Sequence, residues 1–404
     1  MRGDGLTYWY ALLALLGVNV LLHLFLVRFP SYPVFDEFYY VGAARSILFL
    51  GPDLRPEHPP LAQLIIASGI ALLGDIPAGW RIFSILFGVF TILVVYLLVR
   101  DASGNEGLAF AAAFAVSFEN LFFTFSLLGL LDIFFVFFLS LSIYLQFKRR
   151  HALSGVVFAF SVLSKLSAVV AFPLFPIFFL LRKRFSIRRC ENEKGNHSWT
   201  GLLVWLGFFF GAFAVFGFIF DQIYGGLLIP NLVGFGTVQL PIDRAIYANP
   251  LDHLSYIISA HSSTDWPQRT EPPPWLWLVT SRSYYLGTLS LAKDIFLEGF
   301  NPLIMGMAFL SIPLAVYNYI RNRESFLILI FLWFSATYLV WIGVYLLFAR
   351  PLFFFYLVPT IPAIAIANVM FLSRNKTILW VYLGTLLAYF LIFQYPLRAA
   401  FPIP

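Results

Sequence analysis

The chain has 404 residues, of which 60% are hydrophobic and only 11% are charged. Soluble domains carry about 25% charged residues, so this composition excludes an ordinary water-soluble enzyme. The hydrophobicity also excludes a disordered chain. The aromatic content, 19% with 48 phenylalanines, is typical of lipid-facing and interfacial surfaces. The composition therefore predicts an all-α polytopic membrane protein.

The charge balance and the cysteine content exclude further classes. A net charge of +6 can indicate nucleic acid binding, but no basic stripe with interleaved aromatic residues is present, so we expect none. The single cysteine, Cys190, excludes an internal disulfide and a cysteine-ligated metal site. No small-residue cleavage site follows the apolar run from Tyr8 to Val27, which predicts a retained first span rather than a signal peptide.

Apolar windows predict about eleven transmembrane helices. They cover residues 8–28, 82–99, 107–121, 131–147, 153–165, 167–181, 200–220, 302–320, 325–347, 352–372 and 377–394. Segment 60–74 is also apolar, but it is short and begins at Pro59-Pro60. Its length alone does not decide between a further span and a helix lying at the interface.

The positions of the basic residues favour an interfacial segment 60–74. If it does not cross, fifteen of the 26 basic residues lie in short loops on one side of the membrane, and the positive-inside rule makes that side cytoplasmic. These residues are Arg2, Arg100, Lys148, Arg149, Arg150, Arg182, Lys183, Arg184, Arg188, Arg189, Lys194, Arg321, Arg323, Arg374 and Lys376. The sequence thus predicts a cytoplasmic N-terminus and an external C-terminus, in a cell membrane or an endoplasmic reticulum equivalent.

Two long external loops divide the chain into three regions. We expect an N-terminal transmembrane catalytic module over residues 1–222, which includes the first external loop at 29–81. A long external loop with short helices follows at 223–300, and C-terminal transmembrane helices at 301–404. Loops of this length usually serve function, although the second could also cap the bundle against the bilayer surface.

Asp36 and Glu37 follow the first span directly, and an apolar helical pattern comes after them. Adjacent carboxylates in an apolar setting repel one another and lose hydration, which raises the pKa of at least one of them. A raised pKa suits a general base that works near neutral pH. The alternative is structural, because an acidic residue at a helix start satisfies free backbone N–H groups.

Further charged residues gather at the outer ends of the predicted spans. Asp132, Lys165 and Arg350 lie there, and Glu57-His58-Pro59-Pro60 lies in the first external loop. Charges at such depth are costly, so they tend to face a cavity, pair with one another or bind a ligand. Each alone could be an anchor that reaches the interface. Together, the two cations predict a site for a lipid-linked phosphate.

These residues resemble a known family. The first external loop, with Phe35-Asp36-Glu37-Phe38-Tyr39-Tyr40 and Glu57-His58-Pro59-Pro60-Leu61, is similar to that of the protein O-mannosyltransferases. Those are GT-C-fold membrane glycosyltransferases related to the aminoarabinose transferases. Further similar segments are Gly79-Trp80-Arg81-Ile82-Phe83-Ser84, Leu130-Leu131-Asp132, Ser164-Lys165, Pro273-Pro274-Trp275-Leu276-Trp277-Leu278, Phe300-Asn301-Pro302, and Arg350 with Tyr356, Pro359 and Pro362. The roughly eighty residues of the second loop leave no room for the soluble insert of the eukaryotic members.

The resemblance implies an inverting transfer of a sugar, mannose in the family, from a polyprenyl or dolichyl phosphate donor to a hydroxyl group on the external face. The acceptor would be Ser or Thr of exported proteins. Asp36 and Glu37 would form the catalytic pair, with Asp36 as the general base. Lys165, Arg350 and His58 would bind the donor phosphate. The residues expected to orient or bind substrate are Asp132, Tyr40, Arg81, Trp275 and Tyr356. No cofactor is implied, and a divalent metal is compatible with the paired acids but not required.

Other functions stay open at this point. A related enzyme could extend a lipid-linked glycan or modify a lipid. A transporter or flippase of lipid-linked sugars would predict mid-span charges and an internal repeat, and the sequence shows neither. A non-catalytic assembly subunit is a further alternative. The sequence leaves the donor sugar, the acceptor and the oligomeric state undetermined.

Overall fold

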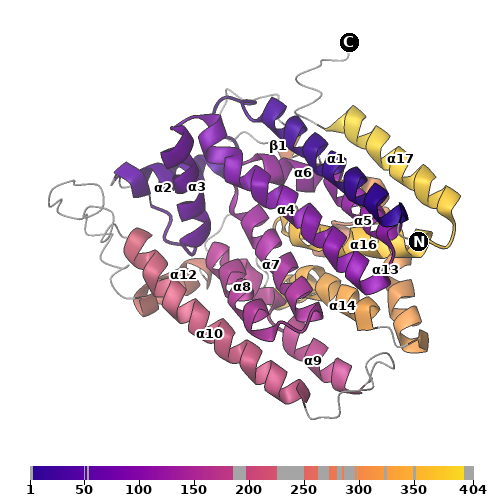
Figure 1. The fold of residues 1–404 in the computed structure, drawn as a ribbon. Coiled ribbons are helices and arrows are strands. Elements are labelled where there is room, and N and C mark those ends of the chain that lie inside the picture. Colours follow the sequence, from indigo (N-terminus) through magenta and orange to yellow (C-terminus); the bar gives the residue numbers. More distant parts are fainter. Residues whose placement is uncertain are drawn as a thin grey trace.

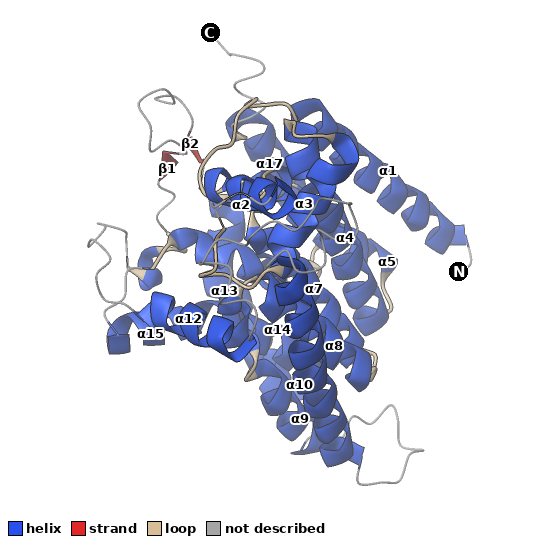
Figure 2. Ribbon diagram, turned by 90° about the vertical axis from the view of Figure 1, so that its left-hand side faces the viewer, coloured by secondary structure: helices blue, strands red, loops and turns tan. Residues whose placement is uncertain are grey.

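A computed structural model describes most of the chain. The described residues are 3–49, 51, 54–184, 197–224, 250–262, 273–279, 284–285, 296–297, 299–322, 325–348 and 352–394. They form a helical bundle, shown in Figure 1, which confirms the predicted all-α class. A short antiparallel pair of strands lies at one edge of the bundle (Figure 2).

The N-terminal half contributes ten α-helices and one 3₁₀ helix among the described residues. They are α1 (Gly3–Leu26), α2 (Glu37–Phe49), α3 (Leu61–Leu73), α4 (Pro77–Ser103), α5 (Glu106–Ser117), α6 (Asn120–Leu127), α7 (Leu131–Phe147), α8 (His151–Ser164), the 3₁₀ helix η1 (Leu166–Ala171), α9 (Leu174–Arg184) and α10 (His197–Tyr224).

In the described C-terminal half, short 3₁₀ and π-helical segments lie between the α-helices. Its elements are α12 (Pro250–Ser262), the 3₁₀ helix η3 (Pro274–Leu276), the antiparallel strands β1 (Tyr284–Tyr285) and β2 (Phe296–Leu297), α13 (Pro302–Asn322), α14 (Ser325–Phe334), the π-helical segment η4 (Ser335–Leu339), α15 (Val340–Phe348), the 3₁₀ helix η5 (Phe354–Thr360), α16 (Ile361–Leu372) and α17 (Lys376–Phe393).

All eleven predicted spans are helical, but fewer are long enough to cross a membrane as single helices. Seven helices of the described chain meet that requirement in length and apolarity, which supports an integral membrane protein. They are Leu6–Leu26, Pro77–Ser103, Trp199–Tyr224, Pro302–Arg321, Phe326–Leu347, Phe354–Leu372 and Lys376–Phe393. The count of eleven is therefore not confirmed.

The predicted span 107–121 is broken rather than continuous. It divides into α5 and α6, which meet at an angle of 67°. Glu119 at the break accepts hydrogen bonds from the backbone N–H of Phe122, at 2.7 Å, and of Asn301, at 2.8 Å. The carboxylate therefore caps α6 and ties it to the start of α13, so the break is held by buried polar contacts.

Segment 60–74 forms α3, a helix of 13 residues. At about 1.5 Å per residue it reaches about 20 Å, less than the hydrocarbon core of about 30 Å. It packs between α2 and α4 at one end of the bundle (Figure 1). This length and position agree with an interfacial helix of the first external loop.

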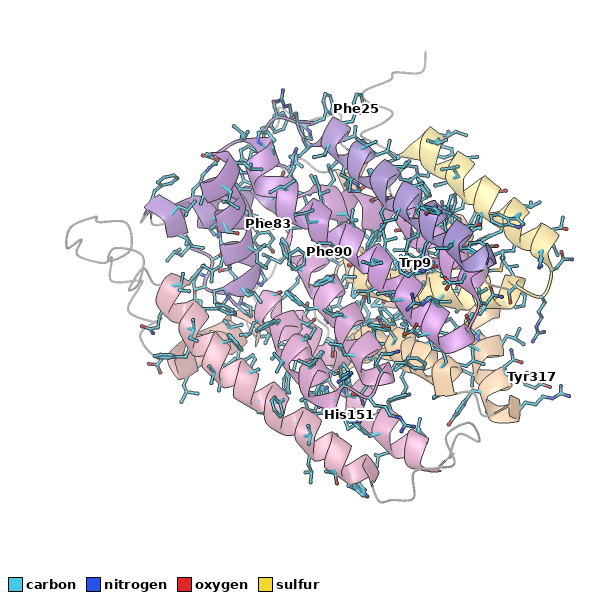
Figure 3. All side chains as sticks on the ribbon, viewed as in Figure 1. Trp9, Phe25, Phe83, Phe90, His151 and Tyr317 are labelled. Atoms are coloured by element: carbon cyan, nitrogen blue, oxygen red, sulfur yellow. The ribbon has the colours of Figure 1, made fainter. Side chains whose placement is uncertain are left out.

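Neighbouring helices pack through aromatic side chains. On α1, Trp9 lies 5.5 Å from the ring of Tyr96 on α4 and beneath the guanidinium group of Arg100 (Figure 3). Further along, α8 packs between α7 and α10, where the ring of Trp205 stacks on Phe175 at 4.5 Å. Such pairs fix helix positions in a bundle that has few charged contacts.

Candidate functional site

Asp36, the predicted general base, lies directly before the first turn of α2. Phe35, directly before it, has a φ of 54°, a left-handed conformation that is strained for a bulky residue. Its ring packs edge-on against Phe355 at 5.4 Å and near Phe125 at 6.5 Å. Packing from two other elements therefore holds the backbone that carries Asp36, which is partly exposed.

Glu37 lies in a different environment from its neighbour. Its oxygens accept hydrogen bonds from Arg81 Nε and Nη2 at 2.8 and 2.7 Å, and from the backbone N–H of Gly129 at 2.9 Å. Arg81 also donates to the carbonyl oxygens of Val27 and Pro30, at 2.9 Å each. Both side chains are completely buried.

This pair fixes the start of α2 against α4 and the loop before α7. Because Glu37 and Arg81 are saturated by protein groups, neither offers a surface to substrate. The sequence prediction gave Glu37 a catalytic role and Arg81 a substrate-orienting role. Their geometry instead favours an indirect role, in which the pair positions Asp36.

Lys165 and Asp132 form a second buried ion pair. The Lys165 ammonium group donates to Asp132 Oδ1 at 2.7 Å, and the two side chains are 7% and 6% exposed. The ammonium group also lies over the rings of Phe355, at 5.3 Å, and Tyr356, at 5.6 Å. An ammonium group has three donors, so this arrangement holds a cation without saturating it.

A narrow pocket adjoins this ion pair. Its lining includes Asp132, Ser167, Trp341 and Tyr356, of which Trp341 and Tyr356 stack at 4.6 Å. The aromatic walls exclude water around the carboxylate, which strengthens any polar interaction made there. The pocket lining thus combines the Asp132 carboxylate with aromatic surface, next to the Lys165 ammonium group.

Tyr40 and His58 form a third contact, where α2 meets the loop before α3. The Tyr40 hydroxyl lies 3.3 Å from His58 Nε2. Burial, followed by the negative charges of Asp36 and Asp132, raises the pKa of Tyr40 well above its usual value. Burial, followed by the positive charges of Lys165, His261 and Arg55, lowers the pKa of His58 well below its usual value. In the tautomer in which the Tyr40 hydroxyl donates to Nε2, the ring hydrogen of His58 is on Nδ1.

His58 Nδ1 is buried and has no hydrogen-bond partner in the described structure. A buried N–H group without a partner is costly, so a ligand oxygen would satisfy it. The charge of Asp36 also acts on Tyr40 and on Lys165, so its carboxylate lies within electrostatic range of both groups. The structure thus brings Asp36, Tyr40, His58, Asp132 and Lys165 together.

No described contact brings Trp275 into this cluster, and a further predicted residue cannot be placed. Trp275 is 44% exposed and its ring contacts Tyr345 at 5.4 Å, whereas its neighbour Trp277 is buried near Tyr356. Arg350 lies outside the described residues. Tyr356 belongs to the cluster through its contact with Lys165.

Sequence reasoning missed a polar group at the ends of α10 and α12. Asp221, His253, Tyr224 and Gln63 are all buried and hydrogen-bonded around the loop that carries His58. The sequence did offer a signal for this group, because Asp221 and His253 are polar residues at the edges of helices that contain apolar residues. Their distance of about 160 residues or more from Gln63 and Pro56 concealed the association.

A surface cavity of about 430 Å³ lies alongside α2. Its lining includes Phe38, Tyr39, Arg45, Phe49 and Arg55, and it extends from the residues just after Asp36 toward the loop before His58. This volume falls in the range of ligand pockets. Within the described chain, no three His, Cys, Asp or Glu side chains are grouped to hold a metal ion.

Comparison with known proteins gives the relationships of the chain. The model of the dolichyl-phosphate-mannose-protein mannosyltransferase family matches residues 57–215. A polyprenol-phosphate-mannose–protein mannosyltransferase of Corynebacterium glutamicum is 24% identical over 405 aligned residues, which cover 82% of this chain and 75% of that protein.

Solved structures share the fold. The protein O-mannosyltransferase Pmt1-Pmt2 complex of S. cerevisiae, bound to the sugar donor, superposes with a TM-score of 0.76 at 11% identity. That match covers 96% of this chain and 90% of the other. ArnT from Cupriavidus metallidurans bound to undecaprenyl phosphate gives a TM-score of 0.55 at 15% identity, over 97% of this chain and 63% of the other.

The matched region contains the Glu57-His58-Pro59-Pro60, Asp132 and Lys165 segments and begins after Asp36-Glu37. The predicted resemblance is therefore confirmed: this chain has the GT-C fold and is related to the protein O-mannosyltransferases.

Proposed function

We propose that this protein is an inverting glycosyltransferase that moves mannose from a polyprenyl phosphate donor to Ser or Thr hydroxyl groups of exported proteins. The observation that carries the proposal is the cluster that contains Asp36. It combines a partly exposed carboxylate, the buried ammonium group of Lys165, and the buried Nδ1 atom of His58, which has no hydrogen-bond partner among the described residues. The named activities of the relatives support the same reaction.

Asp36 acts as the general base. It removes the proton from the acceptor hydroxyl as the oxygen attacks the anomeric carbon of the donor sugar. The bond from that carbon to the phosphate oxygen breaks on the opposite face, so the configuration inverts and the lipid phosphate leaves with the bonding electrons. A positioned base contributes about 10²–10⁴ to the rate of such a step.

Lys165 and His58 stabilise the leaving phosphate. The Lys165 ammonium group retains donors beyond its bond to Asp132, and the Nδ1 hydrogen of His58 satisfies a phosphate oxygen. Arg350 would add a bidentate contact. Tyr40 fixes the His58 ring through its hydroxyl, and Asp132 sets the position of Lys165 and can accept a sugar hydroxyl.

The reaction takes place on the external face. The cluster lies in the first external loop and at the ends of the helices that adjoin it, while the basic loops lie at the opposite ends of the predicted spans. The positive-inside rule then gives a cytoplasmic N-terminus and an external C-terminus. A cysteine-labelling experiment on intact cells, with one cysteine in loop 54–60 and another in loop 148–150, checks this orientation.

A transfer assay with purified protein tests the function. Radiolabelled polyprenyl phosphate mannose is offered with Ser/Thr peptides, with lipid acceptors, or with a lipid-linked glycan, and mass spectrometry identifies the product. We expect labelled peptide from the wild type and at least a hundredfold less from Asp36→Asn, with donor binding retained. If the label appears in the lipid or the glycan instead of the peptide, the proposed protein acceptor is wrong. Full activity of Asp36→Asn would contradict the proposed base.

A further inference from the structure

The loop that carries His58 is held by a buried histidine from a distant helix. His253 on α12 contacts Asp221 Oδ1 on α10 through Nδ1, at 2.8 Å, and the carbonyl oxygen of Pro56 through Nε2, at 2.9 Å. A carbonyl oxygen can only accept, so the Nε2 hydrogen of His253 donates to Pro56. His253 is 1% exposed and Asp221 4% exposed. The contact with Asp221 thus fixes the orientation of the His253 ring, and the ring in turn holds the loop at Pro56.

A tyrosine from the end of α10 holds the same loop beside this contact. The Tyr224 hydroxyl accepts a hydrogen bond from the Arg55 backbone N–H and donates one to Gln63 Oε1, both at 2.8 Å. Gln63 Nε2 in turn donates to the Arg55 carbonyl oxygen at 3.1 Å. The rings of Tyr224 and His253 lie nearly parallel, with an angle of 9° between their planes. Backbone groups of two successive residues, Arg55 and Pro56, are therefore fixed by side chains.

These contacts end two residues before His58. Since the backbone at Pro56 is anchored and Pro59-Pro60 restricts the chain on the other side, His58 has little freedom to move. The ring of His261, also on α12, lies 5.4 Å from the His58 ring. The same helix therefore fixes the loop at Pro56 and contacts the histidine that follows it. Figure 1 shows α12 beside the end of α10, near α2 and α3.

We propose that His253, oriented by Asp221, is a positioning residue that holds His58 at the donor phosphate. The role of His58 rests on the proposed function. The hydrogen bonds of His253 and Tyr224 to Pro56 and Arg55, called the clamp below, are independent of it. His253 does not touch substrate and acts through Pro56. None of the relationships to known proteins assigns this role, and the family match ends at residue 215, before both partners.

A labelling experiment tests the clamp without any substrate. In a Cys190→Ser background, Leu54→Cys places the only cysteine in the held loop, and maleimide labelling reports its opening. His253→Phe keeps a ring that can stack on Tyr224 but loses both hydrogen bonds. We expect labelling about tenfold faster in this variant, a change equivalent to the loss of about one hydrogen bond to a charged group. Ser259→Ala, an exposed position on α12, should leave the rate unchanged.

Two further variants cover the case in which His253→Phe folds poorly. Tyr224→Phe removes only the hydroxyl that bridges Arg55 and Gln63, and we expect a smaller increase in labelling. Asp221→Asn keeps an amide that can hydrogen-bond to Nδ1 but removes the charge, so its labelling rate should lie between those of the wild type and His253→Phe. Wild-type labelling rates in all three variants would overturn the clamp.

A double-mutant cycle tests whether the clamp acts through His58. We expect His253→Phe to raise the KM for the donor about tenfold with less effect on kcat, and to have little further effect in a His58→Ala background. A general structural defect would lower activity in both backgrounds, and such additivity would overturn the positioning role. If His253→Phe is labelled faster but the wild-type protein transfers no sugar, the clamp is supported and the proposed function is rejected. If the wild-type protein transfers sugar but His253→Phe is labelled at the wild-type rate, the proposed function is supported and the clamp is rejected.

Discussion

Arg81 holds both carboxylate oxygens of Glu37, at 2.8 and 2.7 Å, with neither side chain exposed to solvent. The pair joins the start of α4 to the start of α2, one residue after Asp36. The two adjacent carboxylates therefore lie in different environments: Glu37 is completely buried and bound by Arg81, whereas Asp36 is partly exposed. The strained backbone at Phe35 lies at the same junction.

Removing either member of this pair should destabilise the protein. Glu37→Gln leaves the Arg81 charge buried without its partner, a change that typically costs about 3–5 kcal/mol. We expect a large drop in the thermal unfolding temperature in detergent, accompanied by loss of transfer. Circular dichroism during heating measures the first, and the labelled-donor assay the second.

The exposed pair of Arg45 and Asp75 provides a matched control. It has a similar separation, 2.8 Å, but the side chains are 39% and 40% exposed. Solvent screens such a pair, so Asp75→Asn should cost less than about 1 kcal/mol. Equal destabilisation by the two substitutions would contradict the structural role assigned to Glu37.

The Lys165–Asp132 pair should separate stability from activity. Lys165→Gln leaves a buried carboxylate unpaired and should lower both the stability and the affinity for donor. Adding Asp132→Asn removes the remaining charge, so the double variant should regain most of the stability. Transfer should stay low because the phosphate has lost its cation. An active double variant would show that the pair is only structural.

The buried histidine of the first external loop predicts a pH effect on stability. Burial and nearby cations lower the pKa of His58 well below its usual value near 6.5. As the pH falls below about 6.5, His58 becomes protonated in the unfolded chain but stays neutral in the folded chain. The free energy of unfolding therefore decreases until the pH reaches the lowered pKa. His58→Asn should remove this part of the pH dependence of thermal unfolding. Identical pH profiles of wild type and variant would contradict it.

The cavity beside α2 should affect the acceptor more than the donor. Tyr39 and Phe49 line it, are 44% and 69% exposed, and lie on the helix that starts next to Asp36. We expect Tyr39→Ala or Phe49→Ala to raise the KM for a peptide acceptor several-fold, with the KM for the donor nearly unchanged. Leu72→Ala, which removes a side chain of similar exposure on α3, is the control. A rise in the donor KM alone would place the lipid there instead.

The sequence predicted the main chemical groups but not how they pair. Asp36, His58, Asp132 and Lys165 could be singled out because charged residues are rare at the ends of apolar helices. Glu37 was equally visible, yet its union with Arg81 depends on residues 44 positions apart. His253 and Asp221 were not singled out, because their contacts join residues that are far apart in the sequence. Contacts between distant segments depend on packing, which local patterns do not encode.

The scarcity of charge and the long apolar runs predicted a helical membrane protein, because apolar runs of about 20 residues are typical of helices that cross a bilayer. The same scarcity indicated an orientation and marked the residues of the candidate site. Only the tertiary structure decided which charges neutralise one another. In a low-dielectric interior a carboxylate must be paired or hydrogen-bonded, and whether it is saturated by protein or left for a substrate depends on which helix lies next to it.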